Sequence, residues 1–128
     1  MSLVLCNQGE VQILTGFFAG SMTLRLFTND YTPVKASTEA NLTEATGNGY
    51  ATKTLTGGSW TITPGTPTSA AYAQQTFGFT GALGNVYGYY VTRDTDGKLM
   101  FAERFSNGPY NVQQNGDQIK VTPQFTQS

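Results

Sequence analysis

The sequence predicts an all-β fold: a β-sandwich or jelly-roll-like domain of about seven to nine strands, with a short N-terminal helix. Three observations predict it. Thr, Tyr, Phe and Val, which suit a pleated sheet, are frequent. Glycine (15 residues) and proline (5 residues) recur between short apolar runs as turn signals. Within those runs apolar and polar residues alternate, which is the period of a strand.

The chain length of 128 residues favours a single domain with its own core. We see no internal repeat and no second domain. We therefore predict one β domain over residues 1–128, with an N-terminal helix and arm in residues 1–20 and the sandwich in residues 22–126.

The first predicted element is a short helix. Asn7 is a candidate N-cap, and Glu10 three residues later completes a capping-box pattern. An apolar stripe follows, made of Val11, Ile13, Leu14, Phe17 and Phe18. Because a helix this short is marginal alone, the stripe either covers one end of the sheet or anchors the protein on a partner. Ile13, Leu14, Phe17 and Phe18 are thus a first candidate interaction surface.

The first predicted strand covers residues 22–29. Met22, Leu24 and Leu26 alternate with polar residues and are expected to face the core. Residues 30–38 are a predicted loop, since Pro33 disfavours a regular interior strand, and residues 42–46 are either an edge strand or part of that loop. The remaining expectations before the central hairpin are a turn at Asn48-Gly49, strands at 50–55, 60–63 and 71–79, and an extended connector at 64–69.

A hairpin between Val86 and Phe105 is predicted to be the centre of the sheet, with arms Val86–Thr92 and Leu99–Arg104 around the turn Asp94-Thr95-Asp96-Gly97. Strict alternation puts Tyr87, Tyr89 and Val91 on one face, opposite Val86, Gly88, Tyr90 and Thr92. On the second arm it puts Leu99, Phe101 and Glu103 opposite Met100, Ala102 and Arg104. Short strands at 110–112 and 119–125 complete the chain.

Charge and hydropathy limit the partners. The net charge is −1 with only 12% charged residues and no basic run, so the field that attracts nucleic acid is missing. No apolar stretch approaches the length of a membrane span, and Leu3-Val4-Leu5 is too short for the core of a secretory signal. We expect a protein made in the cytoplasm that binds neither nucleic acid nor membrane.

The residues that usually carry catalysis are missing from the sequence. It contains no histidine and one cysteine, Cys6, which removes the ordinary nucleophilic triads and the common zinc sites. Asp94 and Asp96 resemble half of a calcium loop without its remaining acidic ligands, and the hairpin turn explains them. Glu103 is the best carboxylate for glycosidase chemistry, but we expect it to pair with Arg25 or Arg93. We predict no enzymatic activity, no metal and no cofactor.

Aromatic residues suggest a second kind of surface. Trp60, Tyr72, Tyr87, Tyr89, Tyr90 and Tyr110 are either core residues or a platform on which a sugar could stack. Alternation prevents Tyr87, Tyr89 and Tyr90 from all facing inward. We therefore add Trp60, Tyr87, Tyr89 and Tyr110 to the candidate interaction surface.

From residue 22 onward the chain resembles a group of short virion proteins of tailed bacteriophages and prophages. The matching segments are Leu24-Arg25-Leu26-Phe27-Thr28-Asn29-Asp30 with Thr32-Pro33, Tyr50-Ala51-Thr52-Lys53-Thr54-Leu55 with Trp60, Tyr87-Gly88-Tyr89-Tyr90-Val91-Thr92, Ala102-Glu103-Arg104-Phe105 with Gly108-Pro109-Tyr110, and Gly116-Asp117-Gln118-Ile119-Lys120-Val121-Thr122-Pro123. None of these segments is a catalytic signature.

The resemblance implies a structural protein located in the virion. Our leading hypothesis is a capsid decoration (cement) protein that binds the major capsid protein, or other virion proteins, as a homo-oligomer, with a trimer favoured. The alternative is a tail or fibre component that contacts a glycan of the host surface through exposed aromatic residues.

Overall fold

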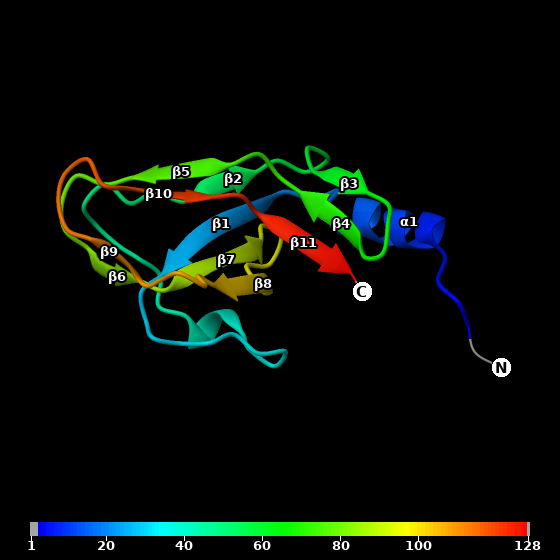
Figure 1. The fold of residues 1–128 in the computed structure, drawn as a ribbon, viewed down its shortest axis with the longest axis horizontal. Helices are drawn as coiled ribbons and strands as arrows, with labels where there is room; N and C mark the ends of the chain where they lie inside the picture. The colour runs from blue at the N-terminus through cyan, green and yellow to red at the C-terminus, as the bar shows by residue number, and fades with distance from the viewer. Residues whose placement is uncertain (1–2, 128) are drawn as a thin grey trace.

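A computed structural model describes residues 3–127, and over this range it confirms an all-β fold with one short helix at its N-terminal end (Figure 1). The helix is α1 (Asn7–Phe17), and Glu39–Asn41 forms a single 3-10 turn, η1. Within the described residues there are eleven strands: β1 (Met22–Phe27), β2 (Lys53–Leu55), β3 (Thr61–Thr63), β4 (Thr68–Ala71), β5 (Gln75–Gly78), β6 (Gly84–Val86), β7 (Gly88–Arg93), β8 (Leu99–Arg104), β9 (Tyr110–Val112), β10 (Gln118–Val121) and β11 (Gln124–Gln127).

The strands form four antiparallel sheets over residues 3–127. The largest has the order β2-β1-β7-β8, a second has the order β11-β4-β3, and β5–β10 and β6–β9 are two-stranded pairs. The strands are shorter and more numerous than the sequence predicted. One reason is Pro123, which interrupts the expected final strand and separates β10 from β11. This topology does not confirm the finer expectation of a β-sandwich or jelly roll.

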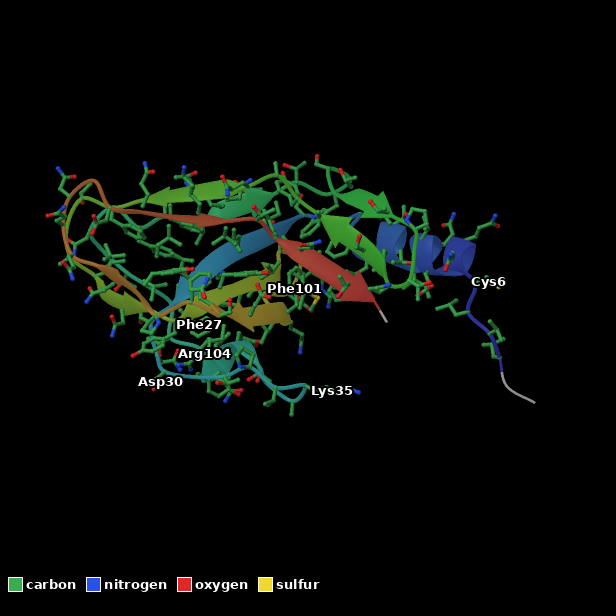
Figure 2. The ribbon with its side chains drawn as sticks, viewed as in Figure 1. Cys6, Phe27, Asp30, Lys35, Phe101 and Arg104 are labelled. Atoms are coloured by element: carbon green, nitrogen blue, oxygen red, sulfur yellow. The ribbon has the colours of Figure 1, made fainter. Side chains whose placement is uncertain are left out.

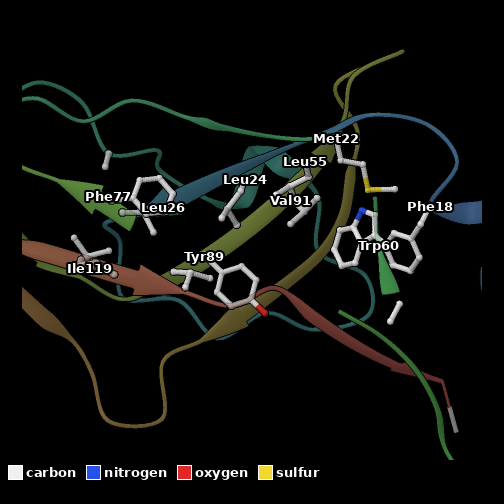
Figure 3. Packing of buried hydrophobic residues seen from close by; sticks show 14 of the residues in the cluster. Phe18, Met22, Leu24, Leu26, Leu55, Trp60, Phe77, Tyr89, Val91 and Ile119 are labelled. Carbon is white, nitrogen blue, oxygen red and sulfur yellow. The ribbon is translucent and has the colours of Figure 1, made fainter. Parts of the chain in front are cut away.

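One main hydrophobic core lies between the largest sheet and the shorter strands that cross it (Figure 3). As predicted, Met22, Leu24 and Leu26 of β1 point into it and are fully buried. The other sheets and α1 supply the opposite wall, with Phe18, Trp60, Ala70, Phe77, Val86, Val112, Ile119 and Val121. Burial of this apolar surface is what stabilises so many short strands.

A second, smaller cluster covers the opposite face of the largest sheet. Phe27 of β1 and Tyr90 of β7 lie in it with Leu42 from the segment after η1. Both faces of β1 and β7 are therefore covered, which explains why almost every residue of β7 is buried.

The N-terminal helix covers one end of the sheets, which is the first of the two roles that the sequence left open for its apolar stripe. Leu14 and Phe18 are buried, and α1 packs on β3 and β4. The predicted cap was wrong: Cys6, whose extended backbone starts the helix, is the N-cap, and Asn7 is the first helical residue. No helix in residues 3–127 is long and apolar enough to cross a membrane.

The central hairpin forms, but two of its predicted features were wrong. β7 lies inside the largest sheet, whereas β8 is at its edge, so the hairpin is not the centre of the sheet. The register shifts opposite Val91 and Thr92, where Met100 is an extra residue. This bulge places Leu99 against the smaller cluster and Phe101 against the main core, although strict alternation predicted one face for both.

The alternation also breaks at Tyr87, which belongs to neither β6 nor β7. As a result Val86 and Tyr89 both point into the main core, and Tyr87 packs against the smaller cluster. The predicted common face of Tyr87 and Tyr89 was therefore wrong.

Candidate functional site

β8 forms one of the two edges of the largest sheet, opposite the edge at β2. β8 pairs with β7, and within residues 3–127 no further strand pairs with its other side. The amide of Phe105 donates to Tyr87 O at 2.9 Å, and Glu103 lies opposite Tyr89. Because hydrogen-bonding directions alternate along an antiparallel strand, the backbone groups of Ala102 and Arg104 point outward, away from β7.

The loop between β1 and η1 is fastened to both ends of this edge. At one end Arg104 Nη1 forms an ion pair with Asp30 Oδ1 at 2.7 Å (Figure 2). At the other end the outward-pointing amide of Leu99 donates to Glu39 Oε2 at 3.1 Å. The pKa of the Glu39 carboxyl is lowered first by a hydrogen bond from Glu39's own amide and second by the bond from the Leu99 amide. The carboxylate therefore stays charged and keeps this contact at neutral pH.

Between these two fastenings the loop and β8 enclose a groove of about 370 Å³. We call it the β8 groove, and it is lined by Pro33, Val34, Lys35, Ser37, Leu99, Met100, Phe101 and Ala102. Six of these eight residues have apolar side chains, and Lys35, Ser37 and backbone groups make the remaining surface polar. Val34 is 63% exposed at its rim. An apolar groove beside unpaired backbone groups is the geometry that receives an extended peptide as an added strand.

The loop wall of the β8 groove has a fixed shape. The amide of Ser37 donates to Val34 O at 2.9 Å, closing a turn. The Ser37 hydroxyl accepts from the Val34 amide at 2.8 Å and lies 2.7 Å from the Tyr31 hydroxyl, whose ring packs against the smaller cluster. A ligand would therefore meet a preformed wall, which reduces the entropic cost of binding.

The predicted interaction residues do not form one surface. Leu14, Phe18, Trp60 and Tyr89 are buried in the main core, and Phe17 and Tyr87 are partly buried. Trp60 is only 7% exposed. Its ring stacks on Phe18 with centroids 4.1 Å apart, and in Figure 3 it lies beside Met22. Ile13 and Tyr110 are exposed, but they lie on α1 and β9, at opposite ends of the molecule (Figure 1).

Tyr110 lies in a separate shallow hollow. The hollow is about 430 Å³ and is lined by Pro109, Tyr110, Asn111, Gln118, Ile119 and Lys120. Tyr110 is 39% exposed, and its ring is supported from behind by Phe105 at a centroid distance of 4.8 Å. The sequence analysis placed Tyr110 on the candidate interaction surface, but it did not identify the amide and amine groups that β10 places beside it.

The charged residues mostly fasten backbone segments together. Arg25 donates to both carboxylate oxygens of Glu44 at 3.0 and 3.1 Å, which attaches residues 43–46 to β1. Arg93 binds Asp96 across the hairpin turn at 2.6 Å. The prediction that Glu103 pairs with Arg25 or Arg93 was therefore wrong. Glu103 instead lies near Tyr89, whose pKa is raised by burial first and by this carboxylate second.

A metal-binding constellation was not found in the part of the chain that the structure describes, where no three Asp, Glu or Cys side chains gather. Asp94 accepts from the Thr23 hydroxyl at 2.6 Å, and Asp96 is paired with Arg93. Both carboxylates of the hairpin turn therefore have protein partners.

The β8 groove was missed by the sequence analysis. Its two fastenings join Asp30 to Arg104 and Glu39 to Leu99, which are more than fifty residues apart in the sequence. The available signal was an acidic residue, Asp30, at the end of one predicted strand and a basic residue, Arg104, at the end of another, and many other pairs of charged residues fit that description. Comparisons with protein-family models, curated proteins and solved structures gave no match to this chain.

Proposed function

We propose that the protein is a non-enzymatic structural component of a bacteriophage virion, acting as a decoration protein on the capsid. The observation that carries the proposal is the β8 groove, where apolar walls lie beside the outward-pointing backbone of Ala102 and Arg104. A site of this kind binds a neighbouring polypeptide through backbone hydrogen bonds and apolar contacts. It offers few charged groups to a small polar substrate.

The resemblance to phage virion proteins supports the same proposal. Its segments overlap β1, β2, β7, β8 and β10, and of the groove lining they include Pro33 and Ala102. In such a protein the shared segments would form the scaffold of the largest sheet. The ion pairs described above also stabilise this scaffold, because each of them joins one backbone segment to another.

The proposal is tested by co-sedimentation with capsids of the encoding phage that lack this protein. We expect the wild-type protein to sediment with capsids at a fixed ratio to the major capsid protein. Failure to bind intact capsids while the protein remains folded would refute the decoration role. Isolated tails serve as the control particle, and binding to tails alone would reassign the protein to the tail.

A glycan-binding role is the second candidate, and the hollow around Tyr110 favours it. An aromatic ring supported by Phe105, next to Asn111, Gln118 and Lys120, combines a stacking surface with hydrogen-bonding groups. Sugar-binding sites use both. This role would suit a tail or fibre component that touches the host surface.

A further inference from the structure

The segment that precedes α1 is an apolar arm without cover. We call Leu3–Leu5 the arm; its three side chains are 97, 77 and 47% exposed. The chain is extended where it enters the helix, with φ −79° and ψ 161° at Cys6. In Figure 1 the arm points from α1 away from the sheets, so it does not lie beside β8 of its own copy. A run of exposed apolar residues of this kind marks a candidate contact surface.

The arm and the β8 groove complement each other. The outward backbone groups of Ala102 and Arg104 are two residues apart, so they would bond to residues two apart on an incoming strand. Leu3 and Leu5 have that spacing, and their side chains would then lie on one face. On β8 that face carries Ala102 and is flanked by Pro33 and Val34 of the loop. The apolar side chains of the arm would thus contact the apolar side chains of the groove. The backbone groups of the arm would pair with the outward-pointing backbone groups of β8.

We propose that the arm of one copy adds as a short strand to β8 of a second copy. Leu3 and Leu5 pack against Pro33 and Val34, and their backbone bonds to Ala102 and Arg104. The inference rests on the proposed function, in which many copies assemble on one particle, and it names the chain that fills the groove. Because arm and groove are different surfaces, the contact runs head to tail, and such contacts close into rings such as a trimer when the rotation allows.

The first test is the mass of the purified protein by sedimentation equilibrium between about 1 and 100 µM, the range of weak to moderate interfaces. We expect wild-type oligomers that persist in high salt, since the contact is apolar. The double variant Leu3→Glu/Leu5→Glu and the groove variant Val34→Asp should each weaken self-association roughly tenfold or more. Leu3 and Val34 are largely exposed and Leu5 is about half-exposed, and none of the three belongs to the core, so these variants should fold.

The control is Ile13→Glu, which adds the same charge on an exposed apolar residue of α1 outside the arm. It should leave the mass distribution unchanged. A wild-type protein that stays monomeric throughout, or an oligomer that responds to Ile13→Glu and not to the arm and groove variants, would overturn the proposal.

The second test is a disulfide between arm and groove, made in a Cys6→Ser background because Cys6 is the one cysteine of the chain. With Leu5→Cys and Val34→Cys together, mild oxidation should link residue 5 of each copy to residue 34 of the next and give a ladder beyond dimers on a non-reducing gel, and Tyr110→Cys in place of Val34→Cys is the control. Tyr110→Cys introduces an exposed thiol at the opposite end and should give no such ladder. A ladder of equal strength from both variants, or none from Val34→Cys, would refute the placement of the arm.

These results separate the arm contact from the proposed function. If the arm contact is wrong and the decoration role is right, the arm and groove variants will keep wild-type mass; the arm variant will still bind capsids, whereas Val34→Asp will weaken capsid binding because the groove then contacts the capsid. If the decoration role is wrong and the arm contact is right, wild-type oligomers will form and respond to the variants, but capsids will not bind them.

Discussion

The ring of Phe27 occupies the space that a side chain at Gly88 would need. A Cβ placed on Gly88 would lie 2.5 Å from Cζ of Phe27 and would also clash with the carbonyl oxygen of Glu103. Phe27 and Gly88 are register partners between β1 and β7, and Arg104 of β8 lies opposite Gly88 on the other side. The glycine thus lets three strands pack around a phenylalanine of the smaller cluster.

Replacing Gly88 with alanine is expected to destabilise the protein, because the new methyl group meets backbone as well as a buried ring. Overpacking of this kind costs about 1–3 kcal/mol of unfolding free energy, measurable by urea denaturation. The control is Gly78→Ala in β5, where an added Cβ meets nothing within 4 Å. That change should stay within about 0.5 kcal/mol, and equal losses for both variants would contradict the close approach at Gly88.

Trp60 is expected to behave as a core residue. Its indole, 7% exposed and stacked on Phe18, should emit at short wavelength and resist quenching by iodide. Trp60→Ala should cost about 3–5 kcal/mol of unfolding free energy because it leaves a large cavity. Circular dichroism would follow this unfolding, since the variant lacks tryptophan. An easily quenched Trp60, or a variant of wild-type stability, would restore the sugar-stacking hypothesis for this residue.

The hairpin turn should contribute stability that depends on pH. The hydrogen bond from Arg93 lowers the pKa of the Asp96 carboxyl from 3.8 to about 2. A group with a lowered folded pKa adds stability above its unfolded value, and that stability is lost as the pH falls through the folded value. We therefore expect the melting temperature of the wild type to exceed that of Asp96→Asn at pH 6, with the difference shrinking from pH 4 towards pH 2. Carboxyl titration by NMR should give Asp96 a midpoint near 2, and a midpoint near 4 would disprove the pairing.

Chelators should leave the melting temperature unchanged. Asp94 and Asp96 are bonded to Thr23 and Arg93, so neither carboxylate needs an ion to balance its charge. Thermal unfolding in excess EDTA, compared with added calcium, measures this directly. A melting temperature that falls in EDTA and recovers with calcium would show that the turn holds a metal.

The Tyr110 hollow gives the glycan hypothesis a specific test. If the protein contacts host glycans, a glycan array should give signals that Tyr110→Ala abolishes, because loss of a stacking ring removes most of the affinity. Trp60→Phe is the control, since it alters a buried ring and should keep the signal. For the proposed capsid role we expect a silent array together with capsid binding that survives Tyr110→Ala. Array signals with no capsid binding would reverse the ranking of the two functions.

Local patterns were sufficient to predict several elements. The alternation of Met22, Leu24 and Leu26 identified the buried face of β1, since one strand face must enter the core. The Asn48-Gly49 turn was also predictable: Asn48 has φ 49° and Gly49 has φ 84°, angles that these two residue types tolerate best.

The errors arose where the fold depends on distant partners. The bulge at Met100 and the break at Tyr87 change which face each side chain takes, and neither leaves a mark in the local alternation. The edge position of β8 depends on β1 occupying the other side of β7, and the paired residues of β1 and β7, from Phe27–Gly88 to Met22–Arg93, are 61 to 71 positions apart in the sequence. The groove could not be predicted for the same reason, because its walls come from two segments that no local pattern connects.

The pairing of β10 and β11 with much earlier strands limits the order in which the protein can fold. β10 pairs with β5, and β11 pairs with β4, so residues 118–127 complete two of the four sheets that residues 3–127 form. Until these residues have left the ribosome, β4 and β5 are without these partners and the main core is open on one side. During synthesis the nascent chain therefore exposes sheet edges that chaperones can bind.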